Sequence, residues 1–265
     1  MVTSSSNNAH FASPIKHLEA SLAASSAHST IVAIRCDDCV ILVSRSQKEE
    51  ASELMPREQD SETTMFEGLT VCKDRGNRWK RLTSTTVCTM TGLTADVQHL
   101  MGVLTRQVES HQALYCDSQP IQLTIRNLAT IFRRTAQREG SRPFGAQALM
   151  VGREASGWQI YTVDPTGLWR HFGSGSTAIG RHADKVKEAL KEALEEVPVL
   201  NAKLGLDMAL SSIMKGVSKS NEKFDSDTYS GLLISMDENG CCQMSKITAD
   251  SIDECYKRYL KQLLM

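Results

Sequence analysis

The stretch with the clearest potential for chemistry is residues 175–182, Gly-Ser-Thr-Ala-Ile-Gly-Arg-His. Its two glycines have the spacing of a phosphate-binding loop, and a helical pattern follows. In that motif a lysine reaches the phosphates and a hydroxyl side chain holds Mg²⁺, but Arg181 and His182 stand at these two positions. A tight connection between a strand and a helix is therefore the favoured interpretation. A nucleotide-binding enzyme that uses Gly175 to His182 is the weaker alternative.

Metal or nucleophile chemistry has less support. Cys36 and Cys39 have the spacing of a metal-binding pair, but no second Cys or His pair stands at a zinc-like distance. Cys241 and Cys242 are explained equally well as strand residues. The seven histidines are dispersed and none lies near a Gly-x-Ser-x-Gly motif, so nothing supports a triad, although triads assemble in space. We expect no metal, no cofactor and no catalytic residue.

The elements that would position these residues are clearest between residues 141 and 180. Apolar, β-branched and aromatic runs alternate there with glycine and proline, which favours strands separated by turns. The predicted strands are 146–151, 158–163 and 168–172, and the Asp-Pro-Thr-Gly sequence of 164–167 fits a type I turn. An antiparallel meander is predicted, and it leads through the small residues 173–180 into a helix.

The rest of the chain consists of similar blocks. Before the meander we expect a helix from Pro14, a hairpin of 31–35 and 39–43, a strand over 81–90, a helix with Thr94 as its N-cap, and a helix after Pro120. The buried faces of the last two helices are predicted to be Val97, Met101, Leu104 and Val108, and Leu123, Leu128, Ile131 and Phe132. After the meander we expect helices at 184–196 and 206–217, a hairpin around Asn239-Gly240 and a helix over 252–264. These segregated blocks favour an α+β fold with an antiparallel sheet.

Composition excludes several classes of function. The 265 residues carry a formal net charge of -1, from 30 basic and 31 acidic residues, which is no electrostatic reason to expect nucleic acid or an anionic membrane as partner. No apolar run approaches the roughly 20 residues that span a bilayer, and the first residues lack an apolar signal core. We expect a soluble, intracellular protein with reduced cysteines. Residues 1–10 are expected to be a mobile tail, and residues 46–77 a charged surface loop.

Several short motifs together resemble one family. These are Thr91 to Asp96 (Thr-Gly-Leu-Thr-Ala-Asp), Arg142 to Gly145 (Arg-Pro-Phe-Gly), Asp164 to Gly167, and Thr177 to Gly180 (Thr-Ala-Ile-Gly). They follow one another as in α-type subunits of the 20S proteasome, and Ser13-Pro14 and Leu18-Glu19 resemble the N-terminal helix of that family. The likeness runs in one order from about Phe11 to the C-terminus.

The resemblance implies a fold and a role. The fold is a four-layer αββα sandwich of the Ntn-hydrolase type, with residues 1–265 as one domain and 11–27 as its N-terminal helical segment. The role is that of a non-catalytic structural and gating subunit of the outer ring, in ubiquitin-dependent protein degradation in cytoplasm and nucleus. The implied partners are other α-type subunits in a seven-membered ring, β-type subunits and activator particles, with no nucleic acid and no membrane.

The resemblance also implies a site. In the family, pockets between neighbouring α subunits accept the C-terminal tails of activators, and a lysine meets the tail carboxylate. The matching residues here are Lys80, or Arg78 by spacing, together with Gly92 and Leu93 at the following junction. A cationic donor facing a terminal carboxylate is the chemistry required. A solvated basic cluster is the competing interpretation.

A β-type threonine peptidase is the alternative within the same fold. That chemistry needs a threonine whose amine is freed by cleavage and serves as base, with an Asp and a Lys nearby. Thr30 follows His28-Ser29 where such a threonine would follow glycine, and the strand of residues 40–43 leads into Ser44-Arg45 without the Asp. The α-type interpretation is therefore favoured.

Overall fold

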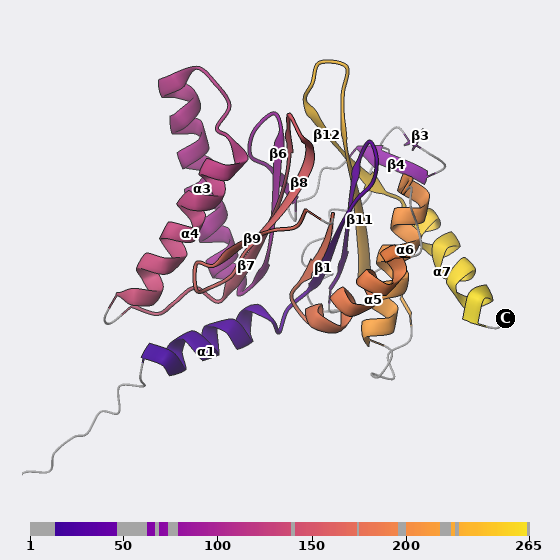
Figure 1. The fold of residues 1–265 in the computed structure, drawn as a ribbon, viewed down its shortest axis with the longest axis horizontal. Helices are drawn as coiled ribbons and strands as arrows, with labels where there is room; N and C mark the ends of the chain where they lie inside the picture. Colours follow the sequence, from indigo (N-terminus) through magenta and orange to yellow (C-terminus); the bar gives the residue numbers. More distant parts are fainter. Residues whose placement is uncertain are drawn as a thin grey trace, which may run out of the picture.

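Two antiparallel sheets lie face to face between two helical layers (Figure 1). This computed structural model describes residues 14–46, 63–66, 69–73, 79–138, 141–173, 175–195, 200–217, 224–225 and 228–263. The expected four-layer αββα sandwich is confirmed. The segregated blocks of the sequence are what this arrangement requires, because each sheet must cover both of its apolar faces.

The two sheets differ in size. The larger has seven strands in the order β10-β1-β2-β11-β12-β4-β3, and the smaller has five in the order β5-β6-β7-β8-β9. The strands of the larger sheet are β1 (Thr30–Arg35), β2 (Val40–Arg45), β3 (Thr63–Phe66), β4 (Leu69–Lys73), β10 (Ser176–Ile179), β11 (Tyr229–Met236) and β12 (Cys242–Ile247). Those of the smaller sheet are β5 (Trp79–Arg81), β6 (Thr86–Gly92), β7 (Ala146–Glu154), β8 (Gly157–Val163) and β9 (Trp169–His171).

Strand β1 shows why both faces of a sheet are apolar. Ile31 and Ala33 belong to the core between the two sheets, whereas Val32 and Ile34 belong to the core beneath helices α5 (Ala183–Glu195), α6 (Ala202–Val217) and α7 (Ala249–Leu263). Successive side chains of a strand point to opposite faces, so a strand buried on both sides is apolar throughout.

The smaller sheet has a helical layer of its own. Helices α3 (Thr94–Tyr115) and α4 (Ile121–Gln137) cover its outer face, with Leu104, Leu128 and Phe132 in their shared core. The predicted buried faces hold in part. Leu104, Val108, Leu128 and Phe132 are buried as predicted, and Val97, Met101 and Ile131 are partly buried. Leu100, which was not predicted, is fully buried, whereas Leu123 is 38% exposed.

The predicted meander and both turn motifs are confirmed. Strands β7, β8 and β9 follow one another in antiparallel register. At their second turn the Gly167 N–H donates to the Asp164 carbonyl (2.9 Å), and Gly167 has a φ of +78° that favours glycine. Gly240 likewise has a positive φ in the hairpin between β11 and β12.

Three expectations are wrong. Residues 176–179, expected to be part of a connection, form strand β10. The chain crosses from the smaller sheet to the larger one after β9, and β10 pairs there with β1. Residues 63–66 and 69–73, inside the expected charged loop 46–77, form β3 and β4, and β4 pairs with β12. The single strand predicted over 81–90 is two strands, β5 and β6, because the chain turns between them. The strands β3, β4 and β10 were missed because each is a short run of strand-forming residues in polar or small-residue surroundings.

The remaining elements match their predictions. Helix α1 (Pro14–Ser25) begins at the predicted proline, and the hairpin that follows is β1 and β2. The expected tail of residues 1–10 and the first part of the loop 46–77 lie outside the described residues.

Candidate functional site

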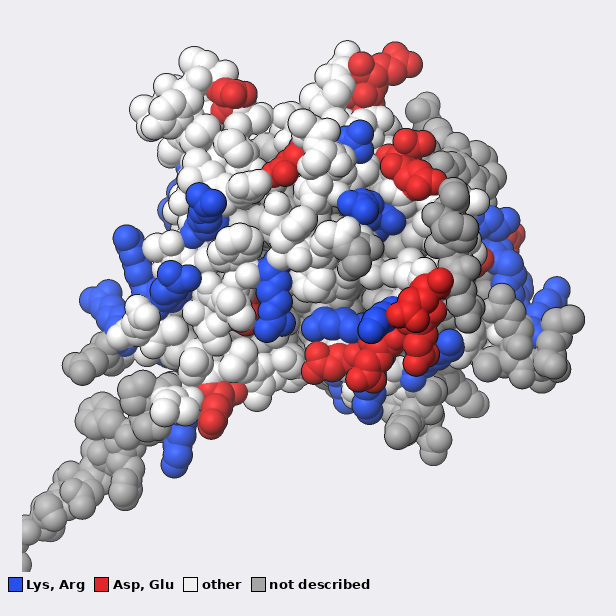
Figure 2. Space-filling view, in the orientation of Figure 1, with Lys and Arg blue, Asp and Glu red and all other residues white. Residues whose placement is uncertain are grey.

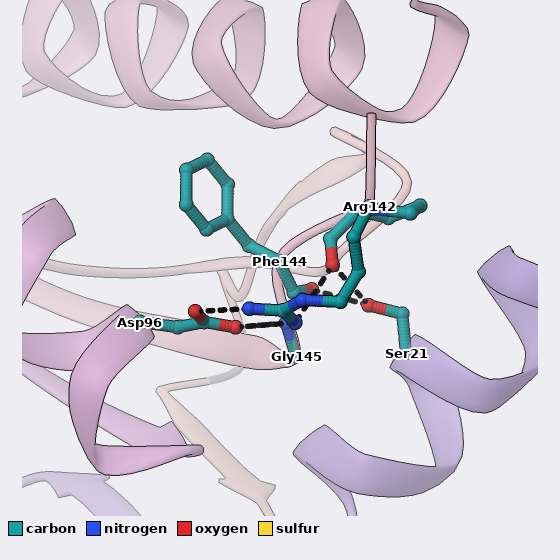
Figure 3. A network of polar contacts seen from close by, with 6 residues as sticks. Ser21, Asp96, Arg142, Phe144 and Gly145 are labelled. Carbon is teal, nitrogen blue, oxygen red and sulfur yellow. Dashed lines mark hydrogen bonds and ion pairs between the residues drawn. The ribbon is translucent and has the colours of Figure 1, made fainter. Parts of the chain in front are cut away.

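Three segments far apart in the sequence meet at one end of the sandwich. They are α1, the junction of β6 with α3, and the loop of residues 141–145 before β7 (Figure 3). Asp96 is their common partner. Its two carboxylate oxygens accept hydrogen bonds from the Arg142 guanidinium at 2.6 and 2.9 Å, and its Oδ2 also accepts the Gly145 N–H at 2.8 Å.

The charge of Asp96 is stabilised by these donors. Burial by itself raises the pKa of the Asp96 carboxyl, but the hydrogen bonds from Arg142 and from the Gly145 amide, with the positive charge of Arg142, outweigh burial and hold that pKa below its usual value. Asp96 lies in the first turn of α3, where the helix dipole also favours an anion. The Asp96 carboxylate is therefore ionised at neutral pH. We call the contacts of Asp96 with Arg142 and Gly145 the Asp96 lock.

Helix α1 joins this lock through Ser21. The Ser21 hydroxyl lies 2.6 Å from the Phe144 carbonyl oxygen and 3.1 Å from that of Pro143, so it donates to the loop that Arg142 also anchors (Figure 3). Farther along the helix, the Gln147 amide donates to Ser25 Oγ at 3.1 Å. Helix α1 is thus fixed to β7 and its preceding loop by polar contacts as well as by packing.

Gly92 and Leu93, two of the predicted site residues, lie in this junction. Gly92 has a φ of +134°, and a Cβ placed on it would lie 2.2 Å from the Gly145 carbonyl oxygen. The Leu93 N–H donates to that same carbonyl at 2.9 Å. Leu93 is also the residue that caps α3, so the prediction of Thr94 as N-cap is wrong by one position, and no side chain caps the helix. Backbone contact with Gly145 takes the place of a side-chain cap.

The structure does not bring Lys80 beside this junction. Lys80 is exposed on β5 and lies opposite Cys88 of β6, four residues before Gly92. At about 3.3 Å per residue this is roughly 13 Å along the sheet. Arg78 lies outside the described residues. Within the single chain, Lys80 therefore lies apart from Gly92 and Leu93, and the pocket that the resemblance implies between neighbouring subunits stays a prediction.

Thr30, the nucleophile of the alternative hypothesis, is an interior residue of the chain. It is 2% exposed, and its hydroxyl donates to the Arg181 carbonyl at 2.7 Å. Arg45 of β2 lies directly opposite, where the alternative would need a carboxylate. The nitrogen of Thr30 belongs to the peptide bond with Ser29, so it would be a free amine only after cleavage of that bond.

The glycine-rich stretch does not form a phosphate-binding loop. Its residues 176–179 pair with β1, with Ile179 opposite Ile31, so their backbone is used in the sheet. A Cβ on Gly180 would lie 2.0 Å from the Ser29 carbonyl oxygen, so this glycine allows two chain segments to approach closely. The nucleotide-binding alternative is therefore wrong in its structural premise.

Two further kinds of site were sought in the described residues, namely metal-binding groups and membrane-spanning helices. Cys36 and Cys39 close a turn in which the Cys36 N–H donates to the Cys39 carbonyl (2.8 Å), and both side chains are buried. Burial raises the pKa of the Cys88 thiol to about 12, so it stays protonated. Across the described ranges, no group of three or more His, Cys, Asp or Glu side chains could hold a metal. Their helices include none that is both long and apolar enough to cross a membrane.

The sequence motifs contained the lock, but its contacts were not predicted. Asp96 and Arg142 were named only as parts of two motifs, and Ser21 was not singled out. A carboxylate in the first turn of a helix and an arginine beside a proline were the available signals. Pairing them needs the tertiary structure, because 46 residues separate them.

Comparison with known proteins gives consistent results. The family model described as "Proteasome subunit" matches residues 60–228. The chain is 29% identical over 135 residues to "Proteasome subunit alpha type-8" of Mus musculus, covering 51% of this chain and 53% of that protein. It is 30% identical over 105 residues to "Proteasome subunit alpha type-2-A" of Arabidopsis thaliana, covering 40% and 44%. The matches thus span about half the length of these curated relatives.

Proposed function

Because this chain belongs to the proteasome subunit family, we propose that it acts as a non-catalytic α-type subunit in the outer ring of a 20S core particle. In this role it is a single structural domain that helps to form the ring and its gate, and so supports ubiquitin-dependent protein degradation. The similarity to proteins named as alpha-type subunits favours this subtype. The proposed location is cytoplasm and nucleus.

The observation that carries the proposal is the segment before Thr30. In a β-type peptidase the segment before the threonine must be cut off, so that the processed chain begins at that threonine. Here α1 precedes Thr30 and is held on the sheet by Ser21, and the Thr30 hydroxyl donates to a backbone carbonyl. In an α-type role this helix remains part of the chain. The ion pair of Asp96 and Arg142 holds the same loop, residues 141–145, to which Ser21 of α1 donates.

The proposed partners are neighbouring α-type subunits in a seven-membered ring, β-type subunits and activator particles. The test is the native mass of the affinity-purified chain from its own cells, measured by native mass spectrometry together with subunit identification. We expect it within a particle of the size of a 20S core that contains β-type subunits. Recovery of the chain only as a monomer, or in a complex without β-type subunits, would overturn the proposal.

Replacing Thr30 with alanine is expected to leave peptide hydrolysis by the assembled particle unchanged. The hydroxyl makes one hydrogen bond to the Arg181 carbonyl, so its removal should cost about 1 kcal/mol of stability and no catalysis. The measurement is hydrolysis of fluorogenic substrates for each cleavage specificity by purified particles. Loss of one specificity in particles that still assemble would show that Thr30 is a nucleophile.

Replacing Lys80 with alanine is expected to weaken activator binding by about tenfold, since a hydrogen bond to a charged group contributes about 1.5 kcal/mol or more. Co-sedimentation of particle and activator measures the affinity, and stimulated peptide hydrolysis measures the response. Lys191→Ala, at an exposed lysine of α5, is the matched control. Arg78→Ala tests the alternative donor, and unchanged binding by both variants would contradict the proposed pocket.

A further inference from the structure

The edge of the smaller sheet opposite β5 carries exposed apolar side chains. Strand β9 is the last strand of that sheet. Trp169 of β9 is 39% exposed, and Leu123 of the adjacent helix α4 is 38% exposed. Leu168 is also exposed, but it belongs with Arg170 to the other face of the sheet, where both line a second pocket. In soluble proteins, apolar side chains gathered at one place mark interaction surfaces, while scattered ones do not. We call this region, formed by β9 and the outer side of α4, the β9–α4 face.

The backbone of β9 is arranged to accept another strand. The Asp164 N–H donates to the Leu168 carbonyl, and the Phe172 N–H donates to the Ile160 carbonyl. In an antiparallel pair, bonded and non-bonded positions alternate, so the amides and carbonyls of Trp169 and His171 point away from β8. An extended peptide can pair with these groups by adding a strand to the edge.

A cavity lies beside this edge on the α4 side. It has a volume of about 230 Å³ and is lined by Gln122, Ile125, Arg126, Tyr161, Trp169 and His171. The Tyr161 ring centroid lies 4.8 Å from that of His171 and 6.3 Å from that of Trp169. Aromatic walls with one cation at the rim suit a single aromatic side chain whose neighbours are anionic.

The charge around the cavity has one dominant sign. Helix α4 contains no Asp or Glu, and its Arg126, Arg133 and Arg134 are all exposed. Figure 2 shows basic side chains on the side of the molecule where Figure 1 places α4. Arg170 of β9 is exposed too, but it lies on the opposite face of the sheet from the cavity. Arg126, Arg134 and Arg170 form no ion pair with any other side chain that the structure describes.

Two acidic groups near α4 and β9, Glu154 and Asp164, have hydrogen-bond partners. The Gln122 amide donates to Glu154 at 3.3 Å, and Asp164 accepts the Thr166 N–H at 2.9 Å within its turn. They reduce the positive potential without neutralising the three arginines of α4. The overall charge of -1 makes this local excess of cations more informative, because it is not a general property of the chain.

We propose that the β9–α4 face binds an extended acidic peptide segment of a partner protein, which pairs with β9 and places one aromatic side chain in the cavity. Alternate residues of a strand share a face, so acidic residues two positions before and after the aromatic residue point to the same side as it does, toward α4 and Arg126. This binding function goes beyond the structural role proposed above and does not depend on it.

The probe is a fluorescein-labelled peptide of sequence Gly-Glu-Ser-Phe-Ser-Glu-Gly, titrated with the purified full-length chain and followed by fluorescence anisotropy. We expect saturable binding that is lost when lysines replace the two glutamates. Binding should weaken at least about tenfold when alanine replaces the phenylalanine, because the cavity is then empty. A peptide with N-methylated backbone amides should also bind weakly, since it cannot pair with β9.

Variants of the protein separate this surface from non-specific attraction. Arg126→Glu and Trp169→Ala should each weaken the probe at least about tenfold, because one removes charge at the cavity rim and the other a wall. Arg106→Glu, at an exposed arginine of α3, is the matched control and should leave binding unchanged. Circular dichroism establishes that each variant folds.

Three results would overturn the proposal. The first is no anisotropy change up to about 1 mM protein, the weakest affinity that a specific peptide site would be expected to have. The second is equal binding of the glutamate and lysine peptides. The third is self-association through this face, seen as a dimer in analytical ultracentrifugation that Trp169→Ala abolishes.

Discussion

Gly92→Ala is expected to destabilise the protein by about 3 kcal/mol or more, which combines an unfavourable positive φ with a steric clash. A Cβ at Gly92 would lie 2.2 Å from the Gly145 carbonyl oxygen and 2.6 Å from the Ala146 Cα, both of them backbone atoms. Backbone cannot swing aside as a flexible side chain can. The junction between β6 and α3 must therefore open to accept the methyl group.

The same substitution at Gly102 is the matched control. Gly102 lies within α3, and a Cβ placed there meets nothing within 4 Å. Alanine is favoured over glycine in helices by roughly 0.8–1 kcal/mol, so Gly102→Ala should stabilise the protein. Denaturant titration of both variants gives the two free energies of unfolding. Equal effects of the two substitutions would show that the β6–α3 junction is not as tight as described.

Asp96→Ala is expected to cost about 2–3 kcal/mol, because a hydrogen bond to a charged group contributes about that much and its loss leaves the Gly145 N–H without its acceptor. The Asp96 side chain is 7% exposed but that of Arg142 is 58% exposed, so water can solvate the arginine that remains. Asp184→Ala, which removes a 96% exposed partner of Lys187, is the control and should be neutral. The readout is the midpoint of thermal unfolding, and similar midpoints for Asp96→Ala and Asp184→Ala would refute the lock.

The stabilisation by Asp96 should also depend on pH. Its folded-state pKa lies below the unfolded value of about 3.9, so its contribution is fully present above that pH and is lost as the pH falls through the folded-state pKa. The difference in unfolding free energy between wild type and Asp96→Ala should be constant from about pH 5 to 8 and shrink below about pH 4. A difference that stays constant down to pH 3 would assign the effect to packing.

Local patterns predict the fold where they extend over enough residues. The meander between Ala146 and His171 and helix α4 were predicted because alternation, turn residues and helical spacing agree there. Strand β10 was not, because four residues rich in small side chains carry little strand signal. Pairing with β1 makes it a strand, and that contact joins residues some 150 positions apart, which no local window contains.

In the candidate site, too, the sequence identified residues but did not predict their tertiary contacts. The resemblance selected Gly92 and Leu93, and both lie at a tight junction, but the reason is a contact with Gly145 across the fold. The resemblance also selected Lys80, on the strand before this junction. Strand register places it opposite Cys88 instead, so proximity in sequence across a turn did not predict proximity in space.

The pairing of β1 with β10 also bears on biosynthesis. The hairpin of β1 and β2 emerges from the ribosome early, with strands that are apolar on both faces. Its partners are β10 on one side and β11 on the other, both in the second half of the chain. At 5–20 residues per second, both edges of this hairpin stay uncovered for on the order of ten seconds. During that interval the nascent chain exposes an apolar hairpin with two unpaired edges, which is prone to aggregate. We expect chaperones to bind it until β10 pairs with β1 and Ile179 lies opposite Ile31.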